Sequence, residues 1–355
     1  MPWKDVIKQL LKRRLAMFCG VVIVLCMLFA VLARVLVKDA DLASRPGVDE
    51  VAEGGTGMER YYHPPGWFLA FSPEHEHWTK TGTDKNGKKN PAIAMEARSW
   101  GLADGNFWRF PMGCDIEGVS VLAKLIRGLE LAFIIGIVPT LISAVIATIM
   151  GLAAGYFGGL VDDIIGFLMS VLASIPLLLL LIAFIQAVKD SEAIARWFEG
   201  VGLGDDKKAV RNLLLVLVVI GVTTWVGLCR LVRGEVIKHK NREYVQAARA
   251  LGCGHGRILF QHILPNVFHL VIITFTLAFV GSVGLEVFLS FVGIGIDPTL
   301  PTWGQVISAA RNELQRDPSV WWPLAGATTL LFVLSLSFSL FGDALRDALD
   351  PKLRT

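Results

Sequence analysis

Six long apolar segments dominate this chain and limit the folds open to it. A helix needs about 20 apolar residues to cross the hydrocarbon core of a bilayer. Among Lys, Arg, Asp and Glu, only Arg34 falls inside any of the six segments. Core helices of a soluble protein do not explain six such segments, and only 18% of the residues are charged while 54% are hydrophobic. The sequence therefore predicts an all-α polytopic membrane protein with six transmembrane helices. The segments run roughly over Leu15–Val37, Leu131–Tyr156, Ile164–Val188, Asn212–Cys229, Val267–Leu285 and Trp321–Gly342.

These segments divide the chain into five parts. The first apolar run is longer than the 7–15 residues typical of a signal peptide, and no A-x-A-like site follows it, which predicts an uncleaved anchor. The parts are an N-terminal segment (1–14), a first transmembrane anchor helix (15–37), an external insert (38–128), a five-helix core (129–342) and a C-terminal tail (343–355).

Basic residues in the connections predict the orientation. They cluster before the first span, between the fourth and fifth spans, and after the sixth. With an even number of spans, all three clusters fall on one side, which the positive-inside rule assigns to the cytoplasm. We therefore expect a multi-pass protein of the inner (plasma) membrane with both termini in the cytoplasm. The connection 189–211 conflicts mildly, because it places five basic residues on the opposite side.

The external insert is rich in glycine, proline, lysine and aromatic residues. Its aromatic clusters, such as those in Tyr61–Trp78, favour either a small packed cap on the membrane surface or a contact with a partner that delivers substrate. His75-Glu76-His77 has the look of a metal site but lacks further ligands nearby, so we predict a surface loop and no metal.

No catalytic pattern is visible in the sequence. There is no G-x-x-x-x-G-K-[ST] phosphate loop and no G-x-S-x-G nucleophile motif, so we expect neither enzymatic activity nor a cofactor bound by this chain. The net charge of +3 gives no reason to expect a nucleic-acid partner, and anionic lipid explains the basic cytoplasmic edges.

The connection between the fourth and fifth spans has the pattern of a folded loop. Helix-forming residues over Arg242–Leu251 are followed by Gly252, which can end a helix in the left-handed conformation. A second run, Ile258–Leu264, precedes Pro265, which we expect to open the next span. Such a loop can dock a soluble partner on one side of the bilayer, or it can lie on lipid as an amphipathic segment.

Several motifs together resemble the C permease of oligopeptide, dipeptide and nickel ABC transporters. Gly252 lies at the family's spacing after Ala247-Ala248, with Gln246 in place of the first glutamate of the E-A-A triplet. Arg127, Leu129 and Glu130 depart from the pattern at the outer entrance. The matching stretches are Gly113–Gly118, Leu122–Gly128, Gly155–Gly159 with Asp162, Ile175-Pro176, Arg230–Arg233, Glu243–Gly252, His262–Asn266, Glu286 with Leu289–Gly293, Trp303-Gly304 and Gly342–Pro351.

The resemblance implies the permease fold of a type I ABC importer. It implies a second permease subunit, two ABC ATPase subunits that use ATP and Mg, and an extracytoplasmic solute-binding protein that delivers peptides or related small solutes. The loop 231–266 would then be the cytoplasmic coupling loop that contacts the ATPase. The residues expected to form this site are Glu243, Tyr244, Gln246, Ala247, Ala248, Gly252, Arg257 and Pro265.

Three other features bear on mechanism. Pro139 and Pro176 can kink their spans, and small residues in the second and fifth spans permit close helix packing. Glu286 lies about 28 Å from Val267 at 1.5 Å per residue, which places it near the outer interface as either a gate or a solvated charge.

An ion-gradient-driven secondary transporter is the main alternative function, but it predicts charges in mid-span and internal repeats. A membrane-anchored scaffold or receptor is a further alternative, but it needs no structured basic loop.

Overall fold

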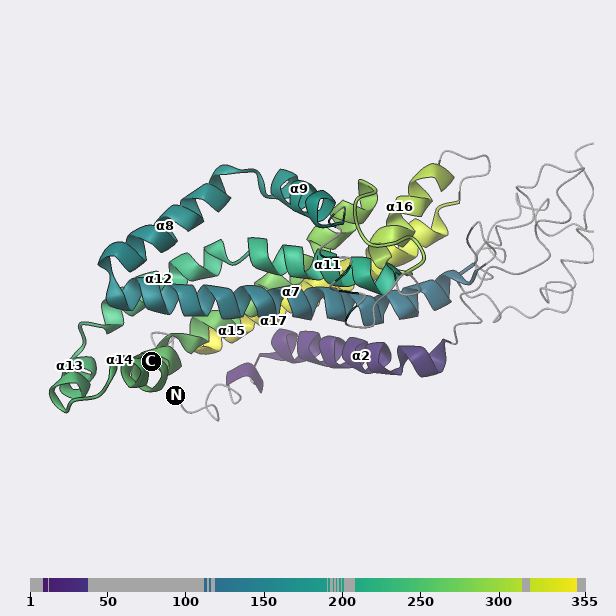
Figure 1. Ribbon diagram of the computed structural model, residues 1–355. Coiled ribbons are helices and arrows are strands. Elements are labelled where there is room, and N and C mark those ends of the chain that lie inside the picture. The colour runs from purple at the N-terminus through teal and green to yellow at the C-terminus, as the bar shows by residue number, and fades with distance from the viewer. Residues whose placement is uncertain are drawn as a thin grey trace, which may run out of the picture. The chain divides into compact units, whose positions relative to one another are not determined.

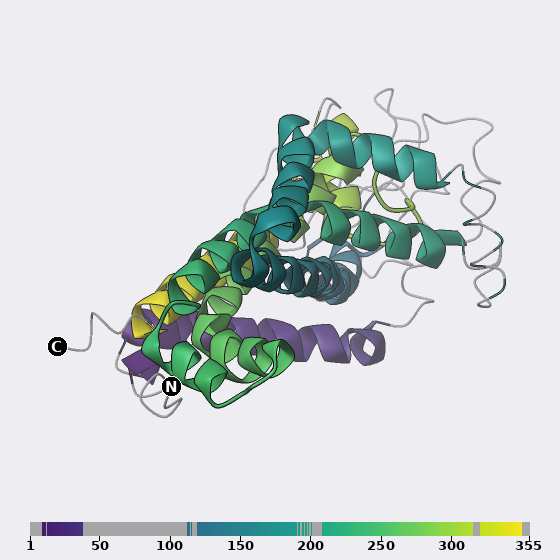
Figure 2. The ribbon, with the colours of Figure 1, turned by 60° about the vertical axis from the view of Figure 1, so that its left-hand side comes forward.

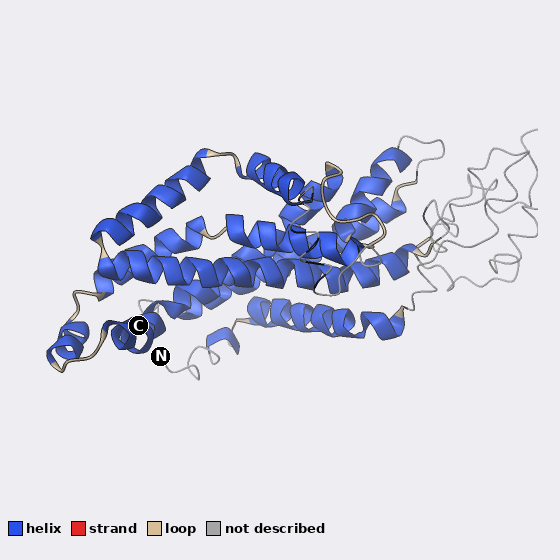
Figure 3. Ribbon diagram, in the orientation of Figure 1, coloured by secondary structure: helices blue, strands red, loops and turns tan. Residues whose placement is uncertain are grey.

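The computed structural model shows a helical membrane protein (Figures 1 and 3). It describes residues 9–11, 13–37, 112–113, 115, 119–189, 191, 194, 196, 198, 200, 208–314 and 320–349. Most of the insert 38–128, with its aromatic clusters and His75-Glu76-His77, lies outside these residues. The described helices are α2 (Arg14–Leu36), α7 (Val121–Phe157), α8 (Gly159–Ser174), α9 (Leu177–Lys189), α11 (Lys208–Thr223), α12 (Val226–His239), α13 (Glu243–Ala250), α14 (His255–Arg257), the π-helix η4 (Ile258–Ile263), α15 (Leu264–Phe291), α16 (Trp303–Glu313) and α17 (Trp322–Leu349).

Five of the six expected spans are helices long and apolar enough to cross a membrane. They are Arg14–Leu36, Val121–Phe157, Lys208–His239, His255–Phe291 and Trp322–Leu349. The third expected span is instead the pair α8 and α9, which meet at an angle of 95°, so the count reaches six when this pair is taken as one span. The bend can be followed in Figures 1 and 2.

Pro176 explains why the third span is broken. Proline has no N–H group and disfavours helical geometry in the residue before it, and Ile175 accordingly has extended backbone with φ −99° and ψ 130°. With 16 and 13 residues, α8 and α9 are about 24 Å and 20 Å long, and each is shorter than the hydrocarbon core of about 30 Å. Pro139, by contrast, lies inside α7, which runs without a break from Val121 to Phe157.

The chain divides into two compact units. The first comprises Met1–Leu25, Phe133–Leu300 and Leu334–Thr355, and the second comprises Cys26–Ala132 and Pro301–Val333.

In the first unit, small residues of α7 allow α12 to pack closely. A Cβ atom added at Gly155 would lie 2.7 Å from Cβ of Val236, and one added at Gly151 would lie 2.8 Å from Cβ of Val232. The expected close packing is therefore confirmed for these glycines. For Gly281 and Gly284 of α15 it stays a prediction, because no described atom of this chain lies within 4 Å of a Cβ atom added there.

Within the first unit, the first and last described segments of the chain meet. Arg13 donates a hydrogen bond to Asp347 at 2.5 Å. Nearby, Leu345 and Leu349 of α17 pack with Leu10, and with Ile272 and Ile273 of α15. The start of α2 and the end of α17 thus lie beside the first part of α15, as an even number of spans requires.

The second unit is built around Trp303. Its side chain is 2% exposed and its indole N–H donates to the carbonyl of Leu125 at 3.1 Å. Thr302 caps α16 by accepting a hydrogen bond from the backbone N–H of Gln305. Gly128 leaves room for this packing, because a Cβ atom there would lie 2.9 Å from the carbonyl oxygen of Pro301.

The charge inside the first expected span has partners in this second unit. Arg34 donates to Glu130 at 2.7 Å, and Arg127 donates to the other carboxylate oxygen at 3.1 Å. Two of the residues that depart from the family pattern therefore pair with each other. A difference in gating or partner contacts at this entrance stays a prediction.

The packing of α7 against α12 gives a testable expectation. Gly155→Ala should destabilise the purified chain by about 1–3 kcal/mol, because the added carbon meets Val236 and the carbonyl of Arg233. Gly227→Ala is the matched control, since Gly227 is helical with open space around it, and it should be neutral or stabilising by up to about 1 kcal/mol. Thermal unfolding in detergent measures both. Equal midpoints for the two variants would contradict the close packing.

Candidate docking surface

Helix α13 is a short separate helix within the loop 231–266, and the sequence explains where it begins and where it ends. It begins after Arg242, which has extended backbone, and Glu243 lies in its first turn, where a negative charge favours the helix dipole. It ends at Gly252, whose φ of +80° lies in the left-handed region. The N–H groups of Gly252 and Cys253 bond to the carbonyls of Arg249 and Ala248, as in a Schellman motif. The predicted role of Gly252 in ending this helix is confirmed.

The two faces of α13 have different surroundings. Val245 and Ala248 are buried, at 0% and 6% exposed, whereas Gln246, Ala247 and Ala250 are exposed. The expectation that Ala247 and Ala248 both serve close approach by a partner is thus wrong for Ala248. It lies on the helix face opposite the exposed residues, and its small side chain instead lets α13 pack against its own chain.

The second half of the loop differs from the expected short helix followed by a new span. His255–Phe291 is helical throughout, with the π-helical stretch η4 between α14 and α15. The N–H of Leu264 bonds to the carbonyl of Leu259, five residues back. In an ordinary α-helix the N–H of residue 265 would bond to the carbonyl of Gln261, but Pro265 has no N–H. A widened turn at this place therefore sacrifices no hydrogen bond. Pro265 therefore lies in the first turn of α15, inside a longer helix.

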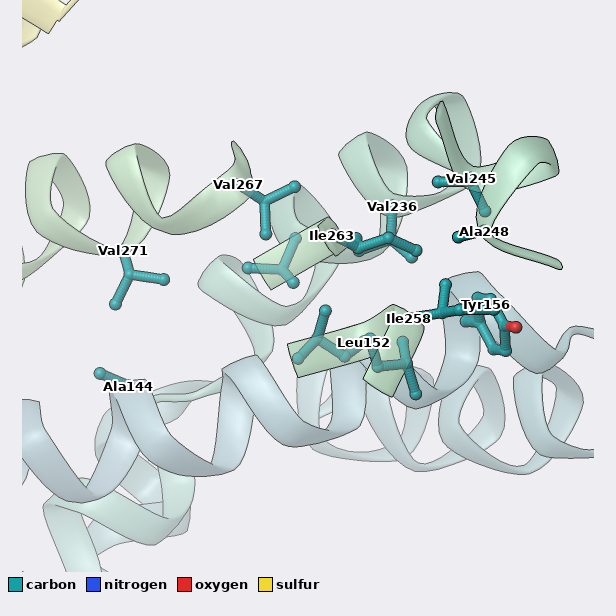
Figure 4. Close-up of a cluster of buried hydrophobic side chains, with 12 residues drawn as sticks. Ala144, Leu152, Tyr156, Val236, Val245, Ala248, Ile258, Ile263, Val267 and Val271 are labelled. Atoms are coloured by element: carbon teal, nitrogen blue, oxygen red, sulfur yellow. The ribbon is translucent and has the colours of Figure 1, made fainter. Parts of the chain in front are cut away.

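A cluster of buried apolar side chains supports the loop from beneath. Figure 4 shows side chains of α7, α12, α13, η4 and α15 pointing toward one another. All are less than 9% exposed, and they hold α13 on the ends of three membrane helices. The cluster consists of Ala144, Leu152, Tyr156, Val232, Val236, Val245, Ala248, Ile258, Leu259, Ile263, Val267 and Val271.

Hydrogen bonds and ring contacts reinforce this base at the end of α7. The Tyr156 hydroxyl lies 2.9 Å from Nδ1 of His255. The guanidinium of Arg249 lies over the ring of Tyr156, 5.2 Å from its centroid, in cation–π geometry. Both ends of the segment between α13 and η4 are thereby tied to the same tyrosine.

Tyr244 and Gln246 hold the first half of the loop together. The Tyr244 hydroxyl lies 2.8 Å from Nδ1 of His239, and burial raises the pKa of this hydroxyl, so it stays protonated at neutral pH. Gln246 donates to the carbonyl of Asn241 at 3.1 Å. Arg257 is exposed and donates to Gln261 one turn along its own helix. These predicted site residues therefore shape the loop as well as its surface.

An ion pair that the sequence analysis did not assign joins the start of the loop 231–266 to α8. Arg233 of α12 donates two parallel hydrogen bonds to Asp162 of α8, from Nε to Oδ1 at 2.5 Å and from Nη2 to Oδ2 at 2.6 Å. Bidentate pairs of this kind are strong and directional. The available signal was the presence of acidic residues before one apolar segment and of basic residues after another.

Glu286 lies apart from the loop, near the other end of α15. Its side chain is buried, at 2% exposed, and accepts a hydrogen bond from Ser290 at 2.8 Å. The alternative of a solvated interfacial charge is wrong for this structure, because the Glu286 side chain is buried within the protein. The role of Glu286 as an outer gate stays a prediction.

The end of α13 generates a prediction about local stability. Gly252→Val should speed amide hydrogen exchange over residues 247–253, because a side chain in the left-handed region costs about 1–2 kcal/mol and more when it is β-branched. Gly254→Val is the control, since Gly254 has φ −66° and ψ 155°, which suit valine. Unchanged exchange in Gly252→Val would show that the helix end does not depend on this glycine.

Comparison with known proteins agrees with this architecture. Residues 130–355 match the family model described as binding-protein-dependent transport system inner membrane component. Residues 1–46 match the N-terminal TM domain of oligopeptide transport permease C.

Individual relatives cover most of the chain. The oligopeptide transport system permease protein OppC of Haemophilus influenzae is 31% identical over 81% of this chain and 79% of its own length. The di/tripeptide transport system permease protein DppC of Pseudomonas aeruginosa is 34% identical over 72% of this chain and 76% of its own. The dipeptide transport system permease protein DppC of Alkalihalophilus pseudofirmus is 27% identical over 100% of this chain and 91% of its own. With more than half of its length matched by the family model, this chain belongs to the family of binding-protein-dependent transport system inner membrane components.

Proposed function

We propose that this chain is the permease subunit of an ATP-driven ABC importer that moves peptides into the cell. In this proposal it pairs with a second permease subunit, sits on two ATPase subunits, and receives substrate from an extracytoplasmic binding protein. The transport family and the peptide-transport functions of the relatives support this assignment. An ion-gradient-driven secondary transporter does not fit the family to which the chain belongs.

The observation that carries the docking part of the proposal is the exposed face of α13. Gln246, Ala247 and Ala250 face outward, while the opposite face is fixed to the ends of α7, α12 and α15. Small side chains at the surface let another protein approach the helix closely. The rigid base lets a force on the helix reach the membrane helices, which a loop lying loosely on lipid does not require.

The orientation follows the same reasoning. The start of α2 and the end of α17 pack beside the first part of α15, close in sequence to the loop 231–266. This end of the first unit carries the basic residues, so we place it, together with both termini, in the cytoplasm. ATP and Mg would be bound by the ATPase subunits, and the permease would contribute no catalytic residue.

Bulk on the exposed face of α13 should weaken ATPase docking. We expect Ala247→Trp to reduce the amount of ATPase that co-purifies with the chain at least tenfold, because the indole occupies the approach surface. The thermal midpoint of the chain alone should not change, since Ala247 is exposed. Ala309→Trp is the matched control, an exposed alanine on α16 in the second unit. Normal ATPase retention by Ala247→Trp would show that α13 is not the docking helix.

The substrate class can be tested on the assembled transporter. The binding protein that co-purifies with the complex should carry short peptides, identified by mass spectrometry after denaturation. Reconstituted vesicles should take up the same peptides only when ATP is supplied on the side of α13. A nickel chelate or an opine as the bound ligand would contradict peptide import while leaving the permease assignment intact.

A further inference from the structure

The bent pair α8–α9 is attached to different helices at its two ends. At the cytoplasmic end, α8 is held to α12 through the bidentate pair between Asp162 and Arg233. Ile165 and Met169 of α8 reinforce this attachment, because they pack with buried residues of α7 and α12. The remainder of α8 is largely exposed, with Phe167 at 68%. The start of α8 therefore follows α12.

At the other end, α9 packs along α11, and its last residue also contacts the segment that follows α15. Lys189, the last residue of α9, donates to the carbonyls of Ile294 at 3.3 Å and Gly295 at 3.2 Å. Gly293, with φ +83°, ends α15, and the N–H of Ile294 bonds back to Leu289. A cation at the carboxyl end of a helix is favoured by the helix dipole, so Lys189 suits this position.

The attachment of Lys189 reaches the buried Glu286. Gly295 packs directly on Ser290, since a Cβ atom at Gly295 would lie 2.6 Å from the backbone nitrogen of Ser290. Ser290 in turn donates to Glu286. A displacement of α9 therefore acts on the segment where the carboxylate of Glu286 is enclosed.

Between the two attachments lies the break at Ile175-Pro176. Ile175 has extended backbone. At the start of α9, the backbone N–H of Leu180 donates a hydrogen bond to the carbonyl of Pro176. At the end of α8, the Ser174 hydroxyl donates a hydrogen bond to the carbonyl of Val171. Two regular helices joined by so short an irregular stretch can change their mutual angle while each stays rigid, as in hinge motions.

The cytoplasmic attachment is also close to the docking helix. Arg233 lies in α12 about two turns before the end of that helix, and α13 begins a few residues later. The contact between Tyr244 and His239 ties α13 to the end of α12. A push on α13 is therefore passed to α12, and from α12 to α8.

We propose that α8–α9 is a lever that links the docking helix α13 to the outer end of α15, with Asp162–Arg233 as its inner link, Ile175-Pro176 as its hinge and Lys189 as its outer link. This inference rests on the proposed docking of an ATPase on α13. Asp162, Arg233 and Lys189 are positioning residues in this scheme. They carry the movement that follows ATP binding to the connection 294–302 after α15.

The test places a reporter beyond the outer link. Thr299 is exposed in the connection after α15, so Thr299→Cys, in a chain without other cysteines, can be labelled by a maleimide that does not cross membranes. Labelling rates are measured in the reconstituted complex with and without a non-hydrolysable ATP analogue. The lever predicts a several-fold change in rate on binding of the analogue. An unchanged rate in the otherwise unmodified complex, with the ATPase retained, overturns it.

Variants of each link separate a lever from a structural ion pair. Asp162→Asn and Lys189→Met should each abolish the change in labelling while the ATPase subunits stay bound and basal ATP hydrolysis continues. Lys189→Arg should restore the change, because it keeps a cation at the end of α15. The controls are Asp163→Asn, next to Asp162 on α8, and Lys208→Met, an exposed lysine at the start of α11, and both should keep the full response.

The outcomes distinguish the lever from the function on which it rests. If the otherwise unmodified complex does not retain the ATPase subunits, the proposed function and the lever both fail. If the subunits are retained and Asp162→Asn and Lys189→Met both show the full response, the lever alone is overturned. If Lys189→Met and Lys189→Arg behave alike, the charge at the outer link has no role and the lever is again overturned.

Discussion

The hydrocarbon core of the membrane leaves no water to satisfy backbone amides and carbonyls, and the helices of this chain meet that requirement even where they are irregular. At the break between α8 and α9, Ser174 turns its hydroxyl to the carbonyl of Val171. In η4, Leu264 bonds to Leu259 across a widened turn. Beyond α15, Lys189 supplies donors to two carbonyls. At each of these irregular stretches, a hydrogen bond outside the ordinary helical pattern satisfies a backbone group.

The same requirement decides where force can enter the protein. The loop 231–266 carries exposed charged residues, such as Arg242, Glu243 and Arg249, around one short helix, α13. Because the inner face of α13 is apolar and buried on the ends of α7, α12 and α15, the helix cannot move without moving its base. Its outer face, with Ala247 at its centre, is left for another protein. The packing therefore supports the proposed energy-coupling role of this loop, as the resemblance does.

The sequence predicted the helical class, five of the spans and the end of α13 at Gly252, because apolar length and glycine geometry are local properties. The sharp bend at Pro176 was foreseen only as a kink, since its angle depends on what α8 and α9 pack against. That Ala247 is exposed while Ala248 is buried could be predicted only from the position of the apolar cluster beneath α13. The pair between Asp162 and Arg233 joins residues 71 positions apart, and the burial of Glu286 depends on how far α15 extends. These features are tertiary: the local sequence supplies the proline and the charges, but not the angle, the pairing or the burial.

The central claim is that one face of α13 is the cytoplasmic surface that receives the ATPase. It can be tested most directly by placing single cysteines along residues 243–251 and labelling inside-out vesicles with and without bound ATPase subunits. The account predicts that positions 246, 247 and 250 are labelled readily by themselves and become protected on assembly, while positions 245 and 248 react slowly in both states. Equal labelling of the exposed positions with and without the ATPase, or labelling only in right-side-out vesicles, would contradict it.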